Sequence, residues 1–328
     1  MSDAIKNKLI LFADNTQLIK KEFAWHSALT VRLAAFLYAQ EGKRVDCNAI
    51  RQSLELIKQN TGVFSAFRGN LAVGMAALLS LSPDPQLIFG ETLKVYDLLK
   101  SLKLRASDYL VVAAYQIAAQ ANPSDYTSII TRTRAFYDGM KSQHFFYTGQ
   151  NDYIFTAMLG LSELDPEAGS ERIERLYSRL KVNFTNKNSV QALAQVLVLG
   201  GSDYNVTDRV LALRDAFRAQ KIRLDKTYTL PTLGILALLP AEPDAIVRDI
   251  DNAVLCLREQ KGFGSVSVSR QEALLFTASL VAGEYTLGNN DGIVRAAVST
   301  SITNIILAQH AAMIAAVSAS AASASSSS

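Results

Sequence analysis

The residues best suited to chemistry lie in two polar segments, 59–70 (QNTGVFSAFRGN) and 142–152 (SQHFFYTGQND). Arg68 could bind a carboxylate or phosphate, and His144 could act as a titratable group at the site. Asp152 could serve as a general acid or base, or as a polar contact. The candidates for binding are Arg68, His144, Thr148 and Asp152, and the candidates for catalysis are Asp108, His144 and Asp152.

A purely structural interpretation of the same residues is also open. Arg68 could bind the carbonyl groups at a helix end, His144 could be a loop histidine with satisfied hydrogen bonds, and Asp152 could cap the next helix. The aromatic residues of the two segments could close the end of the hydrophobic core; they are Phe64, Phe67, Phe145 and Phe146.

The short motifs of familiar active sites are missing from the chain. There is no G-x-x-x-x-G-K-[ST], no G-x-S-x-G and no H-E-x-x-H, and no G-x-G-x-x-G follows a strand pattern. The histidines and cysteines are far apart in the sequence; they are His26, His144, His310, Cys47 and Cys256. We therefore expect no metal cluster, no disulfide framework and no cofactor.

The charge composition limits the partners that we expect. The chain has 33 Lys and Arg and 30 Asp and Glu, which are interspersed and give a net charge of +3. This balance predicts neither a nucleic-acid partner nor a membrane partner. The first residues lack a continuous apolar stretch and a small-residue cleavage site, so we expect a cytoplasmic location.

A recurring lysine shows how the chain is organised. Lys100, Lys141, Lys181, Lys221 and Lys261 are separated by 41, 40, 40 and 40 residues, and Lys58 precedes them. A fixed period near 40 residues is typical of helical repeats. A lysine at the end of each helix would face the negative end of the helix dipole, which is the interpretation we favour. The alternative is a ring of positive charge that recruits an acidic ligand.

Two kinds of helix alternate between the lysines. Helices that are apolar on all sides must be buried, and amphipathic helices cover a core with one face. The apolar, inner helices are expected at 109–119, 190–200, 230–240 and 270–280. The amphipathic, outer helices are expected at 170–181 and 207–221, with earlier helices at about 4–21, 25–39 and 45–59.

The pattern predicts an all-α fold built from αα-hairpin repeats of about 40 residues. The hairpins form a curved superhelix, and its closure into an αα-toroid is left open. Residues 1–317 are expected to form a single domain, and 318–328 an Ala/Ser low-complexity tail. The uncharged stretch from Ala296 onward raises the question of a membrane span, but its polar residues favour a helix packed against the array.

The lysine spacing also measures the connecting loops. Eight residues after four of the lysines stand residues of the type that caps helices, namely Asp108, Ser189, Thr229 and Ser269. Ser269 and Glu272 have the spacing of a capping box. The corresponding residue comes eleven positions after Lys141 and twelve after Lys58, so segments 59–70 and 142–152 are longer. Insertions in repeat proteins often map to one binding rim.

Four stretches together resemble a known family: FRGN (67–70), YDLLK (96–100), MKSQHFFYTGQNDY (140–153) and LAQHAAMIAA (307–316). They are similar to the bacterial family catalogued as domain of unknown function 4003. The most specific part of the resemblance is M-K-x-x-H-x-F-x-T-x-x-x-D, matched by Met140, Lys141, His144, Phe146, Thr148 and Asp152. The resemblance implies a soluble bacterial protein and assigns no activity, substrate or cofactor.

We therefore expect a helical-repeat binding or scaffold protein. It would recognise a protein or a small anionic ligand at the rim formed by loops 59–70 and 142–152. The alternative is an enzyme with an αα-toroid pocket that uses aspartate and histidine for acid–base chemistry.

Overall fold

The computed structural model describes residues 1–144, 146–201, 205–287, 305–309 and 311–313. Within these residues the regular structure is helical throughout and no strand occurs, so the all-α prediction is confirmed. Phe145, His310 and the tail 318–328, which entered the sequence-based predictions, lie outside the described residues.

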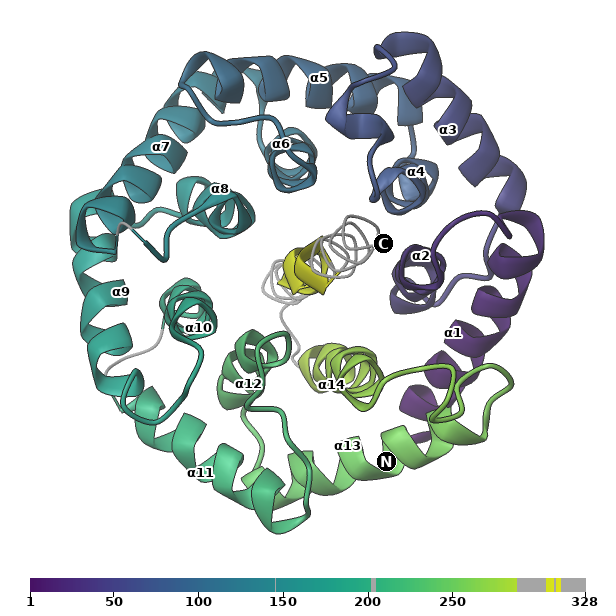
Figure 1. The fold of residues 1–328 in the computed structure, drawn as a ribbon, viewed down its shortest axis with the longest axis vertical. Helices are drawn as coiled ribbons and strands as arrows, with labels where there is room; N and C mark the ends of the chain where they lie inside the picture. Colours follow the sequence, from purple (N-terminus) through teal and green to yellow (C-terminus); the bar gives the residue numbers. More distant parts are fainter. Residues whose placement is uncertain (145, 202–204, 288–304, 310, 314–328) are drawn as a thin grey trace, which may run out of the picture.

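The amphipathic helices form an outer ring (Figure 1). They are α1 (Asp3–Glu22), α3 (Cys47–Asn60), α5 (Pro85–Ser101), α7 (Tyr126–Gln143), α9 (Pro166–Leu180), α11 (Val206–Ala219) and α13 (Pro243–Glu259). Short 3-10 helices occur in the connections: η1 (Ala66–Arg68), η2 (Pro123–Asp125) and η3 (Gln150–Asp152).

The apolar helices form a second ring inside the first (Figure 1). They are α2 (Ala28–Gln40), α4 (Ala72–Leu81), α6 (Asp108–Gln120), α8 (Tyr153–Leu161), α10 (Lys187–Leu199), α12 (Leu230–Ala237) and α14 (Arg270–Leu287). The last outer helix, α13, contacts α1, and α14 contacts both α1 and α2, so the two ends of the chain's helical array meet. Helical residues 305–309 and 311–313 lie at the centre of the inner ring.

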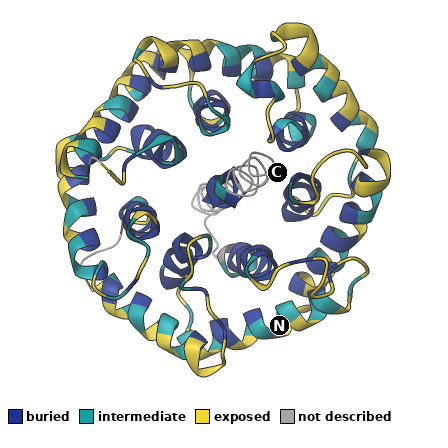
Figure 2. Cartoon of the chain, in the orientation of Figure 1, coloured by how far each residue is buried: buried dark blue, intermediate teal, exposed yellow. Residues whose placement is uncertain are grey.

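The burial pattern follows from the composition of the two kinds of helix (Figure 2). In α8 every residue from Tyr153 to Gly160 is buried, because the helix has neighbours on all sides. In α9 the buried residues form one stripe that includes Ile173, Leu176 and Leu180, and the opposite face is charged. Buried apolar residues from Ile5 to Ala311 form one continuous core.

Small residues allow the helices to approach one another closely. A Cβ atom added to Gly234 on α12 would lie 2.7 Å from Leu193 Cδ1 and 3.1 Å from Val196 Cγ1, both on α10. At Gly160 on α8 an added Cβ would lie 2.8 Å from the backbone oxygen of Ile129. Gly234 therefore allows the inner helices α10 and α12 to pack closely, and Gly160 does the same for α7 and α8.

The connections from outer to inner helices lie together at one end of the rings, because the first turns of the inner helices α6, α8, α10 and α12 lie near one another. Hydrogen bonds join these connections to one another around this end. The Arg105 amide donates to Tyr153 Oη (3.1 Å), Ser189 Oγ donates to the Thr227 carbonyl (2.8 Å), and Arg270 donates to the Lys221 carbonyl (2.8 Å). We call these connections the outer-to-inner segments.

The predicted helix caps were right in part. Ser269 accepts from the Glu272 amide at 3.1 Å, as expected. The prediction was wrong for Asp108, because Ser107 caps α6 and Asp108 is its first residue. It was also wrong for Ser189, because Asn186 accepts from the Ser189 amide and starts α10 earlier. Thr229 precedes α12, but its hydroxyl donates to the Leu224 carbonyl.

The recurring lysines do mark the ends of outer helices. Lys100 and Lys141 lie in the last turns of α5 and α7, and Lys181 is the C-cap of α9. Each of these ammonium groups lies 5.3–5.5 Å from the ring centre of the tyrosine four residues earlier. Stacking on an aromatic ring is thus a second reason, besides the helix dipole, for a lysine at these positions.

No helix in the described ranges combines the length and the apolar character that crossing a bilayer requires. Residues 288–304, 310 and 314–328, which together contain most of the uncharged stretch from Ala296 onward, lie outside those ranges.

Candidate functional site

Asp152 is the centre of a buried polar cluster that holds segment 142–152 against α10. Its side chain is fully buried. Oδ2 accepts from the Gly149 amide at 2.9 Å, and Oδ1 accepts from Gln191 Nε2 at 3.1 Å and from Gln195 Nε2 at 3.0 Å. Burial raises the pKa of Asp152 to about 6, although these hydrogen bonds and Lys141 act in the opposite direction.

Two further residues of the family-like run belong to the same cluster. Gln191 Nε2 also donates to Thr148 Oγ1 at 3.1 Å, and Gln195 Nε2 lies 3.0 Å from Met140 Sδ. Met140, Thr148 and Asp152 thus share the two glutamines of α10. The structure brings Thr148 and Asp152 together, and it uses both to fasten the loop.

His144 is held by contacts to α9. Its Nε2 is paired with Glu174 Oε2, and Glu174 Oε1 accepts from Ser178 Oγ at 2.7 Å. The imidazole ring packs against Tyr177, with ring centres 4.3 Å apart. These contacts agree with the interpretation of His144 as a loop histidine with satisfied hydrogen bonds.

Arg68 is bound to the end of helix α3. Its guanidinium donates to the carbonyl groups of Lys58 and Thr61, and its Nε donates to Thr61 Oγ1 at 3.2 Å. These carbonyls are left without intrahelical donors where α3 ends. Arg68 therefore matches the alternative in which it binds helix-end carbonyls.

The aromatic residues of the two long segments are divided. Phe67 is buried between Phe89 and Tyr96, with ring centres 5.6 and 5.0 Å away. Phe64 is fully exposed and Phe146 is 93% exposed, so the prediction that they close the end of the core was wrong for both. Phe67 already fills the space beside α5, and the segments turn the other two rings outward.

Asp108 lies at the start of α6 beside the 59–70 segment. Its carboxylate accepts from the Asn70 amide. It packs so tightly on Gly69 that a Cβ atom there would lie 2.3 Å from Asp108 Oδ1. Burial raises the pKa of Asp108 to about 6, with the Asn70 hydrogen bond opposing the shift. Asp108, His144 and Asp152 each have their own set of partners.

A cavity of about 280 Å³ lies where the inner helices α6, α8, α10 and α12 begin. Its walls combine aromatic rings with uncharged polar groups, chiefly Tyr109, Tyr228, Asn151, Asn188, Thr227 and Gln309. Asn151 Nδ2 donates to Asn188 Oδ1 at 3.3 Å across the wall. Asn151 comes from segment 142–152, whereas segment 59–70 does not line this cavity.

Gln309 belongs to the central helical residues, and only one of the two polar atoms of its side-chain amide has a hydrogen-bond partner among the described residues. Its side chain is 4% exposed, and its Oε1 accepts from Thr232 Oγ1 at 2.8 Å. Its Nε2 has no hydrogen-bond partner among the residues that the structure describes. A buried amide nitrogen without a partner costs free energy, so a ligand oxygen in this cavity would be favourable for it.

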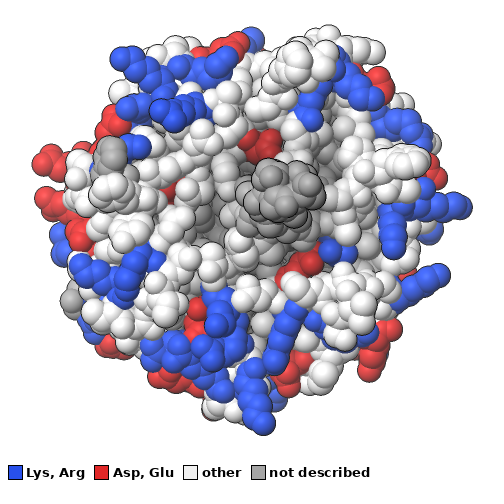
Figure 3. Space-filling model, viewed as in Figure 1, with Lys and Arg blue, Asp and Glu red and all other residues white. Residues whose placement is uncertain are grey.

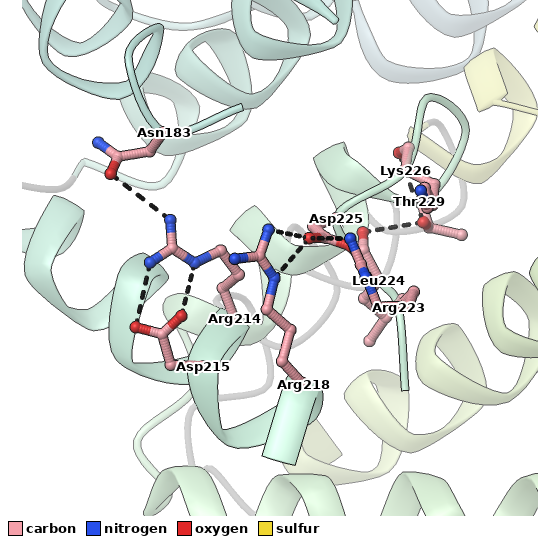
Figure 4. A network of polar contacts seen from close by, with 9 residues as sticks. All are labelled: Asn183, Arg214, Asp215, Arg218, Arg223, Leu224, Asp225, Lys226 and Thr229. Atoms are coloured by element: carbon pink, nitrogen blue, oxygen red, sulfur yellow. Dashed lines mark hydrogen bonds and ion pairs between the residues drawn. The ribbon is translucent and has the colours of Figure 1, made fainter. Parts of the chain in front are cut away.

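The loop that carries Thr227 and Tyr228 is braced by an ion-pair network (Figure 4). Asp225 Oδ2 accepts from Arg218 Nε at 2.8 Å, and Asp225 Oδ1 accepts from Arg223 Nε at 3.0 Å. Thr229 Oγ1 closes the same loop onto the Leu224 carbonyl at 2.8 Å. This side of the cavity is therefore preformed.

The residues of this region that the sequence did not lead us to predict are mainly glutamines with buried side-chain amides. Gln191, Gln195 and Gln309 are polar residues inside otherwise apolar helices, in VQALAQVLV and LAQHAAM. That pattern was a usable signal, because a buried amide needs a polar partner. Tyr109 and Asn188 carried no comparable signal. Among the described residues, no group of His, Cys, Asp and Glu side chains is arranged to hold a metal ion.

No curated protein and no solved structure matches the chain. One family model does match, and it spans residues 15–311, which is most of the sequence and includes both long segments and Gln309. This confirms the resemblance that rested on the run from Met140 to Asp152. The chain belongs to the family described as protein of unknown function (DUF4003).

Proposed function

We propose that the chain is a non-catalytic binding protein that holds a small anionic ligand, such as a carboxylate or a phosphate ester, in the cavity beside segment 142–152. The observation that carries this proposal is the Gln309 amide. It is buried, it lines the cavity, and its Nε2 lacks a partner among the described residues. A ligand oxygen that accepts from Nε2 would satisfy it.

The surrounding helices support a negatively charged ligand. Tyr109, Asn188 and Pro231 belong to the first turns of α6, α10 and α12, so the positive dipole ends of these three helices lie beside the cavity. Among the described residues, the cavity wall has no carboxylate that would repel an anion. Arg68 does not belong to the proposed ligand site, because its guanidinium donates to the Lys58 and Thr61 carbonyls at the end of α3.

A thermal-shift series tests the proposal. Wild type is screened against phosphate, citrate, small carboxylates, sugar phosphates and neutral sugars, and the comparison is repeated with Gln309→Ala. The matched control is Gln116→Ala, which removes another buried amide that is unpaired among the described residues and does not line the cavity. An anion should stabilise wild type and the control and fail to stabilise Gln309→Ala. Equal stabilisation of both variants would contradict the proposal.

Acid–base catalysis at Asp108 is the second candidate. Its pKa of about 6 suits proton transfer near neutral pH, and Asp108 and Asp152 both act on the pKa of Tyr109 in the cavity wall. Incubating each stabilising ligand with the protein and following it by NMR separates the two functions. Conversion that Asp108→Asn abolishes would favour the enzyme, and an unchanged ligand favours the binding protein.

We also propose that the units of about 40 residues are repeats and that the two rings are an αα-toroid. The positions of Lys100, Lys141 and Lys181 at successive outer-helix ends support the repeat, and the contacts of α13 and α14 with α1 support closure. A bacterial, cytoplasmic setting remains part of the proposal. It is supported by the unpaired Cys47 and Cys256, which suit a reducing compartment.

A further inference from the structure

Large apolar side chains are exposed on several of the outer-to-inner segments, at one end of the rings. Trp25 and Phe64 are fully exposed in the segments that follow α1 and α3, and Phe146 is 93% exposed after α7. Val182 and Val266 are exposed in the segments after α9 and α13. Scattered single exposures are normal, but these five share one end of the molecule.

The same end is basic, because the outer-to-inner segments follow the ends of the outer helices. Acidic residues lie at or near the start of these helices, and basic residues at or near their ends, as the helix dipole favours. The acidic residues are Asp46, Asp84, Asp125, Asp165, Asp208 and Asp244. The basic residues are Lys58, Lys100, Lys141, Lys181, Lys221 and Lys261.

The lysines therefore lie at or beside the outer-to-inner segments. Their separation from the acidic residues is partial, because the outer helices lie around the ring and Asp208, in the first turn of α11, pairs with Arg179, in the last turn of α9, at 2.6 Å. We call the end formed by the outer-to-inner segments the basic face. Figure 3 shows Lys and Arg side chains in several groups around this face, with smaller groups of Asp and Glu between them. Two acidic residues of this end add little negative charge to its surface. Asp152 is buried, and Asp225 is paired with Arg218 and Arg223.

We propose that the basic face docks on the surface of a bilayer that contains anionic lipids. Trp25, Phe64 and Phe146 would enter the headgroup region while the lysines meet lipid phosphates. Aromatic and aliphatic tips beside lysines are the combination that binds peripheral proteins to such surfaces. The expectation of no membrane partner came from the total charge, which does not reveal how the charges are distributed.

The geometry favours a bilayer over other occupants. The apolar tips come from segments spread around the whole end of the rings, which suits a broad and fluid surface. A second copy that used the same face would bring lysines against lysines, which like-charge repulsion disfavours. The inference is independent of the cavity ligand, because its test uses neither Gln309 nor any soluble anion.

Trp25 is the one tryptophan of the chain, so its fluorescence reports directly on the docking surface. The full chain is mixed with vesicles of phosphatidylcholine containing about 30% phosphatidylglycerol, and separately with phosphatidylcholine vesicles. Trp25 emission should shift to the blue with the anionic vesicles alone. The binding should weaken steeply between roughly 0.05 and 0.5 M salt. An unchanged emission with the anionic vesicles at low salt would overturn the proposal.

Matched variants test which residues bind the vesicles, with co-sedimentation as the readout. Phe64→Ala combined with Phe146→Ala should weaken binding about tenfold, whereas Leu87→Ala combined with Leu255→Ala, also exposed but outside the basic face, should not. Reversing Lys100 and Lys261 to glutamate should weaken binding more than reversing Lys43 and Arg44, which are exposed at the opposite end. Equal effects of the paired variants would overturn the proposal.

Discussion

Arg32 and Glu272 form a bidentate ion pair that joins the first inner helix, α2, to the last, α14. Arg32 Nε lies 2.5 Å from Glu272 Oε1, and Arg32 Nη2 lies 3.1 Å from Oε2. The two residues are 240 positions apart in the sequence, and their side chains are only 10% and 5% exposed. Glu272 was expected to complete a capping box with Ser269, and it is used instead where the two ends of the array meet.

Removing one partner of this pair should be costly. Arg32→Ala leaves the Glu272 carboxylate buried without its cation, and we expect a loss of about 3–5 kcal/mol in the free energy of unfolding. Arg32→Met combined with Glu272→Leu should lose much less, because no buried charge remains. Urea unfolding followed by circular dichroism measures both. If the double variant were as unstable as Arg32→Ala, the buried charge would not be the cause.

Asp152 should make stability depend on pH. Its pKa is raised from 3.8 to about 6 on folding, so the folded chain holds the proton more tightly than the unfolded chain. The tighter proton binding stabilises the folded state fully below about pH 4, and this stabilisation is lost as the pH rises through about 6. The free energy of unfolding changes by about 3 kcal/mol over this range. Asp152→Asn cannot titrate and keeps only one oxygen to accept the hydrogen bonds from Gly149, Gln191 and Gln195.

The comparison of wild type with Asp152→Asn isolates this effect from the other carboxylates. The unfolding free energy of wild type minus that of the variant should fall between pH 4 and pH 7, by up to about 3 kcal/mol. Urea titrations at several pH values give this difference. A difference that stays constant with pH would mean that Asp152 titrates normally in the folded protein.

Replacing glycine by alanine should have opposite effects on stability at Gly160 and at Gly90. An alanine Cβ at Gly160 would lie 2.2 Å from Thr133 Oγ1 and 2.8 Å from the Ile129 oxygen, so α7 and α8 would have to move apart. We expect Gly160→Ala to destabilise the protein by about 1–3 kcal/mol. Gly90 lies within α5 with nothing within 4 Å of an added Cβ, and Gly90→Ala should stabilise by about 0.5–1 kcal/mol. Thermal unfolding of the two variants checks both signs.

Arg209 should stabilise the end of α12 by binding its carbonyls. Its Nε donates to the Ala237 oxygen at 2.9 Å and its Nη2 to the Leu239 oxygen at 2.7 Å, and Arg132 binds the end of α8 in the same way. Arg209→Ala should cost roughly 2–4 kcal/mol, and Arg209→Lys an intermediate amount because the fork geometry is lost. Arg175→Ala, at an exposed arginine, is the control and should change stability by less than about 1 kcal/mol.

Much of the local structure was predictable because it depends on neighbours along the chain. The lysine spacing located the ends of the outer helices, and the apolar runs identified the inner ones. The cap positions were predicted less well. Asp108 and Ser189 are suitable capping residues, but Ser107 and Asn186 are equally suitable and make the bonds. Choices between adjacent polar residues depend on how each helix packs.

The candidate site was less predictable, because its residues meet only in the folded molecule. Segment 142–152 was singled out by its length, but the connection between α7 and α8 is no longer than the connections between α11 and α12 and between α13 and α14. It does supply Asn151 to the cavity. Arg68 and His144 have the residue types of a binding site, yet the helix ends and Glu174 use their polar groups. Residue type gives the chemistry that is possible, and the partners determine which chemistry is left for a ligand.

By itself, the sequence determined the helices, their length and which of them are buried, since periodicity and capping act over a few residues. It also determined that outer helices begin with acidic residues and end with lysines. Only the tertiary structure decided that the outer-to-inner segments gather at one end of the rings, that Gln195 meets Asp152, and that Thr232 meets Gln309. Such contacts join residues 43 and 77 positions apart, and they depend on how the helices are arranged around the rings.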